Sequence, residues 1–223
     1  MKFNNKIIKK ICNVLVKLKH IIYVSKDSLS IKNKKVLFCD LGANIGISYL
    51  FFKKFYRKNT TFFLFEPNAN CYKKLLQLTA QHKMVHVKNV AVSSISRTFK
   101  FYESLNDEFS EGGSISKDYV RACSFYSEAK KKIFVKAINF NNFLKKNFKN
   151  FDKIIVKMDV EGEEINLIES LIKNKTLTMI DILYVEFHTN YVKNSQHRNF
   201  KNIEQKIISY IKKKTNIVLR IWH

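Results

Sequence analysis

The sequence predicts an α/β protein whose mostly parallel sheet is covered by helices on both faces. Short apolar runs of strand length alternate with segments in which apolar residues recur every three or four positions. The length of 223 residues and the 46% hydrophobic content fit one domain with a sizeable core. Unusual polar residues stand at the ends of the apolar runs, which is where a parallel sheet places its ligand.

The first helical pattern covers residues 3–22. Its apolar residues are spaced by three, four and seven positions and therefore share one face: Ile7, Ile8, Ile11, Val14, Leu15, Leu18, Ile21 and Ile22. The preferred interpretation is a helix packed on the domain through this stripe. The alternative is a helix lying on an anionic membrane surface, because lysines occupy much of the remaining surface. We divide the chain into this amphipathic helix with its lead-in, residues 1–30, and a main domain, residues 31–223.

The remaining elements follow in alternation. Strands are expected at 36–41, 61–66, 84–92, 98–102, 133–137, 153–159, 182–187 and 217–222. Helical periodicity is found at 47–55, 72–79, 140–147, 165–172 and 200–211. A strand followed by a helix, repeated at this period, is typical of a parallel sheet with helices on both sides.

Polar residues collect at the carboxyl ends of these strands. They are Asp40, Glu66, Asn89, Asp159 with Glu161, and Glu186 with His188. The carboxyl ends of parallel strands meet at one edge of the sheet, so these side chains are expected to surround one site.

The turn DLGANIG, residues 40–46, is expected to bind part of a ligand. Gly42 leaves room for a ligand near the backbone, Gly46 lets the next helix pack closely, and Asn44 can donate or accept within the turn. The start of that helix offers free N–H groups. Glu66, twenty residues beyond Gly46, ends the next strand and can accept hydrogen bonds from both hydroxyls of a ribose.

The turn favours S-adenosylmethionine over a dinucleotide. It lacks the G-x-G-x-x-G pattern that binds a pyrophosphate. The carboxylate of Asp40 would repel a pyrophosphate, whereas it suits a sulfonium or the ammonium of a methionine moiety.

The chain resembles the FkbM-type, S-adenosylmethionine-dependent methyltransferases from about residue 35 to 190. The resemblance lies in CDLGANIG, FEPNANCYKKLL, VAVS, IIVKMDVEGEEINLIESL and LYVEFH. It implies a Rossmann-like class I methyltransferase fold and O-methylation, often of sugar or polyketide hydroxyls. It also implies that Asp40, Gly42, Asn44, Gly46 and Glu66 contact the cofactor, with the 89–92 segment, including Asn89 and Ala91, near the adenine.

The chain departs from this class at its end. Class I methyltransferases usually finish in a strand hairpin, whereas only one strand is visible after residue 211. We expect a sheet that lacks its last strand or completes an edge through a partner.

Methyl transfer to a hydroxyl usually needs a general base. The candidates are Asp159, His188, Glu161 and Glu186, with Asp159 preferred and His188 next. Each has a structural alternative: the acids could cap the following helix, and His188 could be a satisfied residue at a strand end. Asp159 and Glu186 could also share a hard divalent cation with a substrate diol, although no spacing motif supports a metal.

The charge and the cysteine content indicate which classes of partner the protein binds and where in the cell it is expected. The net charge is +23, but only five of the 41 basic residues are Arg, so the excess is interpreted as a solvated lysine surface and not a specific nucleic-acid site. The four cysteines have no metal-ligand or C-x-x-C spacing, and no apolar run approaches ~18 residues. A cytoplasmic protein is expected, with contact at the inner face of the membrane through residues 3–22 as an alternative.

The expected acceptor is a small molecule or a glycan. The family resemblance implies a hydroxyl, and we expect it on a sugar of a cell-surface glycan or glycolipid precursor. The alternatives are an RNA methyltransferase and a non-catalytic module that binds a membrane surface or a partner. Gly112 and Gly113, adjacent glycines in a glycine-poor chain, suggest a mobile loop over the site or an ordinary turn.

Overall fold

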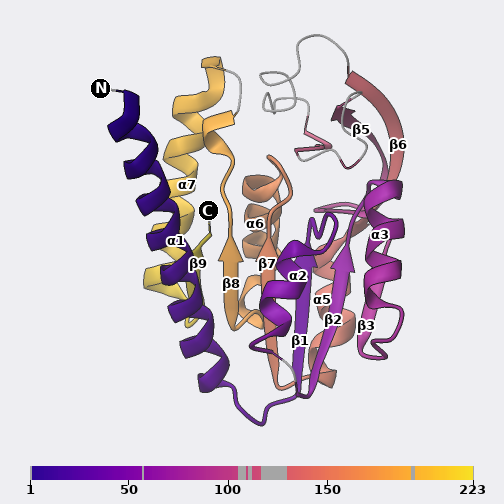
Figure 1. The fold of residues 1–223 in the computed structure, drawn as a ribbon. Coiled ribbons are helices and arrows are strands. Elements are labelled where there is room, and N and C mark those ends of the chain that lie inside the picture. The colour runs from indigo at the N-terminus through magenta and orange to yellow at the C-terminus, as the bar shows by residue number, and fades with distance from the viewer. Residues whose placement is uncertain are drawn as a thin grey trace.

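A computed structural model describes residues 2–56, 58–104, 109, 112–116, 130–191 and 194–222. Its centre is a parallel sheet of six strands with helices on both faces, and a smaller three-stranded sheet lies beyond one end of it (Figure 1). The predicted fold class is therefore confirmed. The division at residue 30 is not tested by this architecture and stays a prediction.

The six strands lie in the order β3-β2-β1-β7-β8-β9, and every neighbouring pair is parallel. Their bounds are Val36–Leu41 for β1, Thr60–Phe65 for β2, Val85–Lys88 for β3, Lys153–Met158 for β7, Ile182–Val185 for β8 and Val218–Ile221 for β9. β1 and β7 are central and have a neighbouring strand on both sides, so the residues that follow them lie in the middle of the sheet's carboxyl edge. No antiparallel strand joins this sheet among the described residues.

Alternation along β1 explains why helices cover both faces. Leu37, Cys39 and Leu41 pack into one core with α5, α6 and α7, which span Phe140–Asn147, Glu164–Lys173 and Asn194–Lys214. Val36 and Phe38 point to the opposite core, which contains α2 (Ile47–Lys53) and α3 (Ala69–Thr79). Successive strand side chains point to opposite faces, so an unbroken apolar strand requires two cores.

The predicted strand over 84–92 is wrong in one respect, because the chain breaks it in two. β3 ends at Lys88, and β4 (Ala91–Ser93) pairs with β6 (Lys130–Asn139) in the smaller sheet. β5 (Arg97–Ser104) completes that sheet, antiparallel to β6. The side-chain amide of Asn89 donates to the backbone carbonyls of Glu66 and Pro67, which turns the chain between the two sheets.

The first helix, α1 (Lys2–Ser30), packs on the domain through a different face from the predicted one. Its buried residues include His20, Val24 and Asp27. The carboxylate of Asp27 accepts a bidentate pair from Arg220 of β9, at 2.9 and 2.5 Å, and a hydrogen bond from Tyr184 of β8 at 2.8 Å. The predicted packing stripe is exposed wherever the side chains of α1 are described, while Ile7, Ile8 and Ile11 lie outside those side chains.

Hydrophobic period alone misidentified this face. Two contacts fix α1 on the domain. One is the ion pair between Asp27 and Arg220, and the other is the stack of His20 on Trp222, whose ring centroids lie 3.9 Å apart. The part of the chain described here contains no helix with the length and hydropathy needed to cross a membrane.

Candidate functional site

A cavity of about 750 Å³ opens at the carboxyl ends of the central strands. Its polar wall comes from the turn after β1, from Glu66 after β2, and from residues that follow β7 and β8, namely Asp159, Glu161 and Glu186. Segments far apart in sequence thus meet in one site, as the parallel sheet predicted. The volume lies within the usual range for small-molecule sites.

Gly42 is required because the end of β7 approaches the turn closely. A Cβ at Gly42 would overlap the backbone oxygen of Asp159, and Gly42 has a φ of +80°. Gly46, with φ of +95°, lies under the side chains of Leu75 and Leu78, so it permits close packing of α2 on α3. The sequence predicted room for a ligand at Gly42, whereas the group that approaches it is the backbone of Asp159. At Gly46 the sequence predicted close helix packing, and there α2 packs on α3. Gly42 lines the cavity, whereas Gly46 does not.

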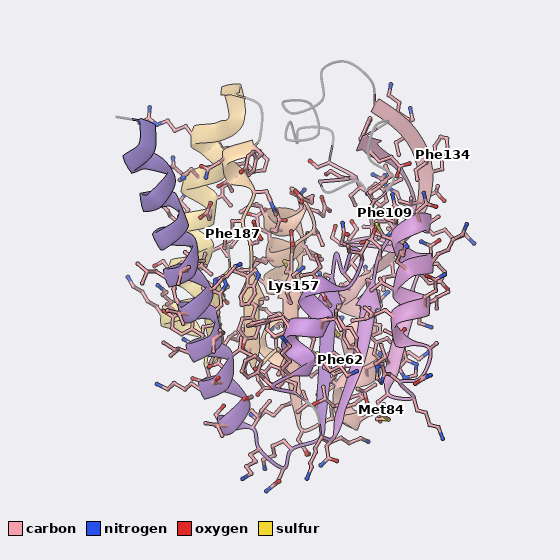
Figure 2. The ribbon with its side chains drawn as sticks, in the orientation of Figure 1. Phe62, Met84, Phe109, Phe134, Lys157 and Phe187 are labelled. Atoms are coloured by element: carbon pink, nitrogen blue, oxygen red, sulfur yellow. The ribbon has the colours of Figure 1, made fainter. Side chains whose placement is uncertain are left out.

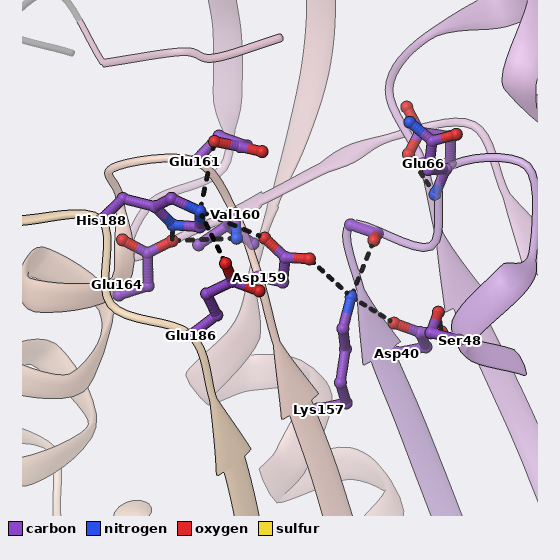
Figure 3. Close-up of polar contacts among 12 residues, drawn as sticks. Asp40, Ser48, Glu66, Lys157, Asp159, Val160, Glu161, Glu164, Glu186 and His188 are labelled. Carbon is purple, nitrogen blue, oxygen red and sulfur yellow. Dashed lines mark hydrogen bonds and ion pairs between the residues drawn. The ribbon is translucent and has the colours of Figure 1, made fainter. Parts of the chain in front are cut away.

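Lys157 is a buried cation that joins β7 to the end of β1, and it lines the cavity (Figures 2 and 3). Its Nζ lies 3.3 Å from the carboxylate of Asp40 and 3.0 Å from that of Asp159, and it donates to the backbone oxygen of Gly42 at 3.1 Å. Burial alone would lower the pKa of Lys157, but the charges of Asp159 and Asp40 outweigh burial and raise it above the ordinary value. Lys157 is therefore protonated, and its ammonium group holds the carboxylates of Asp40 and Asp159 and the backbone oxygen of Gly42 close together.

Asp40 has a different environment from the one predicted. It is fully buried, accepts a hydrogen bond from Ser48 at 2.6 Å, and does not line the cavity. Lys157 offsets its charge, so Asp40 acts on the cavity through Lys157 and the turn. The negative charge along the cavity wall comes instead from Asp159, Glu161 and Glu186.

Glu66 lies at the cavity wall with both carboxylate oxygens oriented by backbone amides. Asn44 N–H donates to one oxygen and Asn68 N–H to the other, both at 2.8 Å. Burial raises the pKa of Glu66 to about 7, against the lowering effect of these two amides. Each oxygen keeps a further lone pair for a donor in the cavity.

The other predicted cofactor residues divide into two groups. Asn44 and Ala91 line the cavity together with Val90 and Val92. Asn89 does not; it holds the loop of Glu66 and Pro67 from behind. Gly112 and Gly113 line the cavity as well, on the side of the smaller sheet.

His188 is buried behind the acidic wall and contacts four carboxylates (Figure 3). Its Nδ1 lies 2.9 Å from Glu164, and its Nε2 lies 3.3 Å from Glu161 and 3.7 Å from both Asp159 and Glu186. Burial alone would lower the pKa of His188, but the hydrogen bond and charge of Glu164, with those of Glu161 and Asp159, raise it to about 9. At neutral pH His188 is an imidazolium, and it does not line the cavity.

Two residues of the site were missed by sequence reasoning. Lys157 could have been found as a lone cation inside the apolar run KIIVKM, and Glu164 as the last acid of the EGEE segment. The carboxylate of Glu164 accepts from the backbone N–H of Val160 and Gly162 as well as contacting His188. Glu164 thereby fixes the loop that carries Glu161, whose φ of +50° is unusual for a residue with a side chain.

The same donors could hold a cation, since ligand atoms of Asp159, Glu161 and His188 lie within 4.8 Å of one another. The cavity lining also has apolar side chains, including Ile21, Ile47, Phe51, Phe55 and Trp222, together with Lys17, His20 and Lys54.

Comparison with known families shows that the family model described as "Methyltransferase FkbM domain" matches residues 40–216. Neither the curated proteins nor the solved structures contain a match.

Removing the buried cation should destabilise the protein. Lys157→Met leaves the carboxylates of Asp40 and Asp159 without their shared partner, so the free energy of unfolding should fall by about 3–5 kcal/mol. Lys153→Met is the matched control on the same strand, because Lys153 pairs with Asp181 at a half-exposed position and should contribute about 0–1 kcal/mol. Urea unfolding of the three proteins measures both values, and equal effects at the two positions would contradict the assignment.

The proton on His188 should make stability depend on pH. The folded pKa of about 9 exceeds the unfolded value of ~6.5, so the folded protein binds more protons in this interval. The His188 contribution is fully present below pH ~6.5, and the free energy of unfolding should fall by up to about 3 kcal/mol as pH rises through 9. Glu66 acts in the same direction but in a lower interval, between its unfolded pKa and about 7.

Unfolding free energies measured from pH 6.5 to 9 test this. His188→Gln should be less stable than wild type at pH 6.5 and should approach it as pH rises. A constant difference between the two proteins across the interval would show that His188 is not protonated in the folded state.

Proposed function

Because the chain belongs to the FkbM methyltransferase family, we propose that it methylates a hydroxyl oxygen carried by a sugar of a cell-surface glycan or of its lipid-linked precursor. Family membership makes the chain an S-adenosylmethionine-dependent methyltransferase. The observation that supports a hydroxyl acceptor is the shared cavity: three carboxylates face the same space as the turn of Gly42 and the carboxylate of Glu66.

The residues present fit this cofactor. Glu66 presents two oxygens in fixed positions, each with room for one more donor, which suits the two hydroxyls of a ribose. The backbone of Gly42, Ala43 and Asn44 borders the cavity, and Ala91 and Val92 offer an apolar surface for the adenine. When bound, S-adenosylmethionine supplies a methyl group on a positively charged sulfur. The acidic wall of Asp159, Glu161 and Glu186 suits that charge.

Asp159 is the proposed general base. Lys157 donates to both Asp159 and the backbone oxygen of Gly42, so this carboxylate is held beside the cofactor turn. One Asp159 oxygen is bonded to Lys157, and the carboxylate still lines the cavity, where it can accept a hydroxyl proton. The acceptor oxygen would lose its proton to Asp159 as it gains the methyl group, and Asp159 would then release the proton to water.

His188 is proposed as a positioning residue. Its imidazolium lies behind Asp159, Glu161 and Glu186 and offsets the repulsion among them. Glu161 and Glu186 also line the cavity, and a carboxylate can accept more than one hydrogen bond, so both suit further hydroxyls of a sugar. The aromatic part of the lining, with Phe51, Phe55 and Trp222, suits the carbon face of a sugar or an attached lipid.

Cofactor binding should depend on Glu66 and on pH. Glu66→Ala should weaken binding of S-adenosylhomocysteine by roughly 1.5–3 kcal/mol, the usual range for hydrogen bonds to a charged group. Ribose hydroxyls donate to the carboxylate form, so binding should release a proton near the Glu66 pKa of about 7 and weaken below it.

Calorimetry in two buffers with different ionisation enthalpies measures both quantities. Glu169→Ala, which removes an exposed carboxylate from α6, is the control and should change neither. Absence of cofactor binding by the wild type, or unchanged proton release in Glu66→Ala, would contradict the assignment.

Removal of the base should affect turnover more than binding. Asp159→Asn keeps an acceptor for Lys157 but cannot take a proton at neutral pH, so turnover should fall ~10²–10⁴-fold with nearly unchanged cofactor affinity. Glu161→Gln, Glu186→Gln and His188→Gln should have smaller effects on turnover. The assay is mass spectrometry of nucleotide sugars and glycolipids after incubation at saturating cofactor.

The assay is repeated after dialysis against a chelator. Full activity is expected if the imidazolium of His188 balances the carboxylates. If the chelator abolishes activity and Mg²⁺ or Mn²⁺ restores it, a metal ion bound by Asp159, Glu161 and His188, and not an imidazolium, balances the carboxylates.

In the assay of the variants, full activity of Asp159→Asn would show that Asp159 is not the general base.

A further inference from the structure

The helix α1 carries two distinct faces. One face packs on the domain through His20, Val24 and Asp27. The other exposes large apolar side chains to solvent, with exposed fractions of 49% for Leu18 and 63% for Ile22. The exposed apolar residues of α1 are Val14, Leu15, Leu18, Ile21, Ile22 and Leu29, and we call this set the α1 apolar stripe.

The α1 apolar stripe lies opposite the packed face. Leu18 and Ile22 precede His20 and Val24 by two residues each, which is about 200° around a helix. The spacing of Val14, Leu18, Ile22 and Leu29 by four and seven positions keeps them on one side of the helix. A monomer gains nothing from a continuous apolar stripe in water, so this face points to a partner.

Lysines flank the stripe on both sides. Lys17 and Lys19 are adjacent to Leu18 in sequence and therefore lie about 100° to either side of it, and both are exposed. Lys26 lies close to the angular position of Lys19 and is exposed as well. No acidic residue precedes Asp27, and Asp27 is buried against Arg220. The exposed surface of α1 is thus apolar in the middle and cationic at the edges.

We propose that α1 lies in the plane of an anionic lipid bilayer, with the α1 apolar stripe inserted between the headgroups. Aliphatic residues flanked by lysines are typical of helices that bind membrane surfaces. Protein interfaces are enriched in Tyr, Trp and Arg, and the α1 apolar stripe contains none of them. The net charge of +23 adds attraction to an anionic surface.

The attachment of α1 to the domain would fix the orientation of the whole protein on the membrane. Asp27 binds Arg220 and Tyr184, and His20 stacks on Trp222, so α1 is held at two points. Lys17 and Ile21 also line the cavity of the functional site. The cavity therefore borders the membrane-binding face, and this placement, which rests on the proposed function, favours an acceptor attached to a membrane lipid.

Vesicle cosedimentation tests the proposal without cofactor or acceptor. The probe is an equimolar mixture of phosphatidylcholine and phosphatidylglycerol, compared with phosphatidylcholine alone. Wild type should bind the mixed vesicles, bind pure phosphatidylcholine much more weakly, and lose binding as salt is raised. Lys19→Gln with Lys26→Gln should weaken binding to the mixed vesicles roughly tenfold or more.

The stripe is tested by Leu18→Glu combined with Ile22→Glu, which should abolish vesicle binding. The matched control is Met84→Glu combined with Phe134→Glu. These residues are 52% and 73% exposed and lie far from α1 (Figure 2), and this variant should bind like wild type. All changes are at exposed positions, and circular dichroism with S-adenosylhomocysteine binding confirms that each variant is folded.

The proposal is overturned if wild type does not bind the anionic vesicles. It is also overturned if the stripe variant binds them as well as wild type, or if the control variant loses binding as much as the stripe variant does. A wild-type dimer that the stripe variant dissociates, with no vesicle binding, would assign the α1 apolar stripe to contact between copies of the chain. None of these results depends on methyl transfer, so failure here leaves the proposed function standing.

Discussion

The site depends on one buried cation. Lys157 lies on the central strand β7, and its ammonium group binds the carboxylates of Asp40 and Asp159 and the backbone oxygen of Gly42. These groups come from the ends of two adjacent strands, so Lys157 fixes how the turn of Gly42 faces the acidic loop after β7. Without Lys157, the carboxylates of Asp40 and Asp159 would repel each other in a region of low dielectric constant, and the arrangement of the two strand ends would be destabilised.

A second cation repeats the same principle at the cavity wall. His188 is held by Glu164 and lies behind Asp159, Glu161 and Glu186, so the wall can carry several carboxylates at close range. The protein as a whole has a net charge of +23, yet Asp159, Glu161 and Glu186 gather at one wall of its cavity. These two facts are compatible because the lysine excess is on the surface, and the exposed lysines of α1 flank its apolar stripe. The acidic wall is balanced instead by the buried cations Lys157 and His188.

The sheet and the location of the site could be predicted because both follow from local rules. Apolar runs with alternating helices require a parallel sheet, and the polar residues at strand ends then meet at one edge. The role of Lys157 could not be predicted, since a lysine inside a strand acquires its role only from neighbours on β1. The packed face of α1 was predicted wrongly for the same reason: Asp27 and His20 are bound by Arg220 and Trp222, some two hundred residues away. Asn89 and Asp40 illustrate a further limit, because a polar residue at a strand end can support the site from behind.

We infer that Lys157 holds the proposed base, Asp159, beside the turn of Gly42, so that one cavity serves both cofactor and acceptor. A crystal structure with bound S-adenosylhomocysteine would test this inference. We expect the ribose hydroxyls to contact Glu66, the sulfur to lie over the turn of Gly42 on the side of Asp159, and Lys157 still to bridge Asp159 and Gly42. A sulfur directed away from Asp159, or a ligand bound outside the cavity, would contradict it.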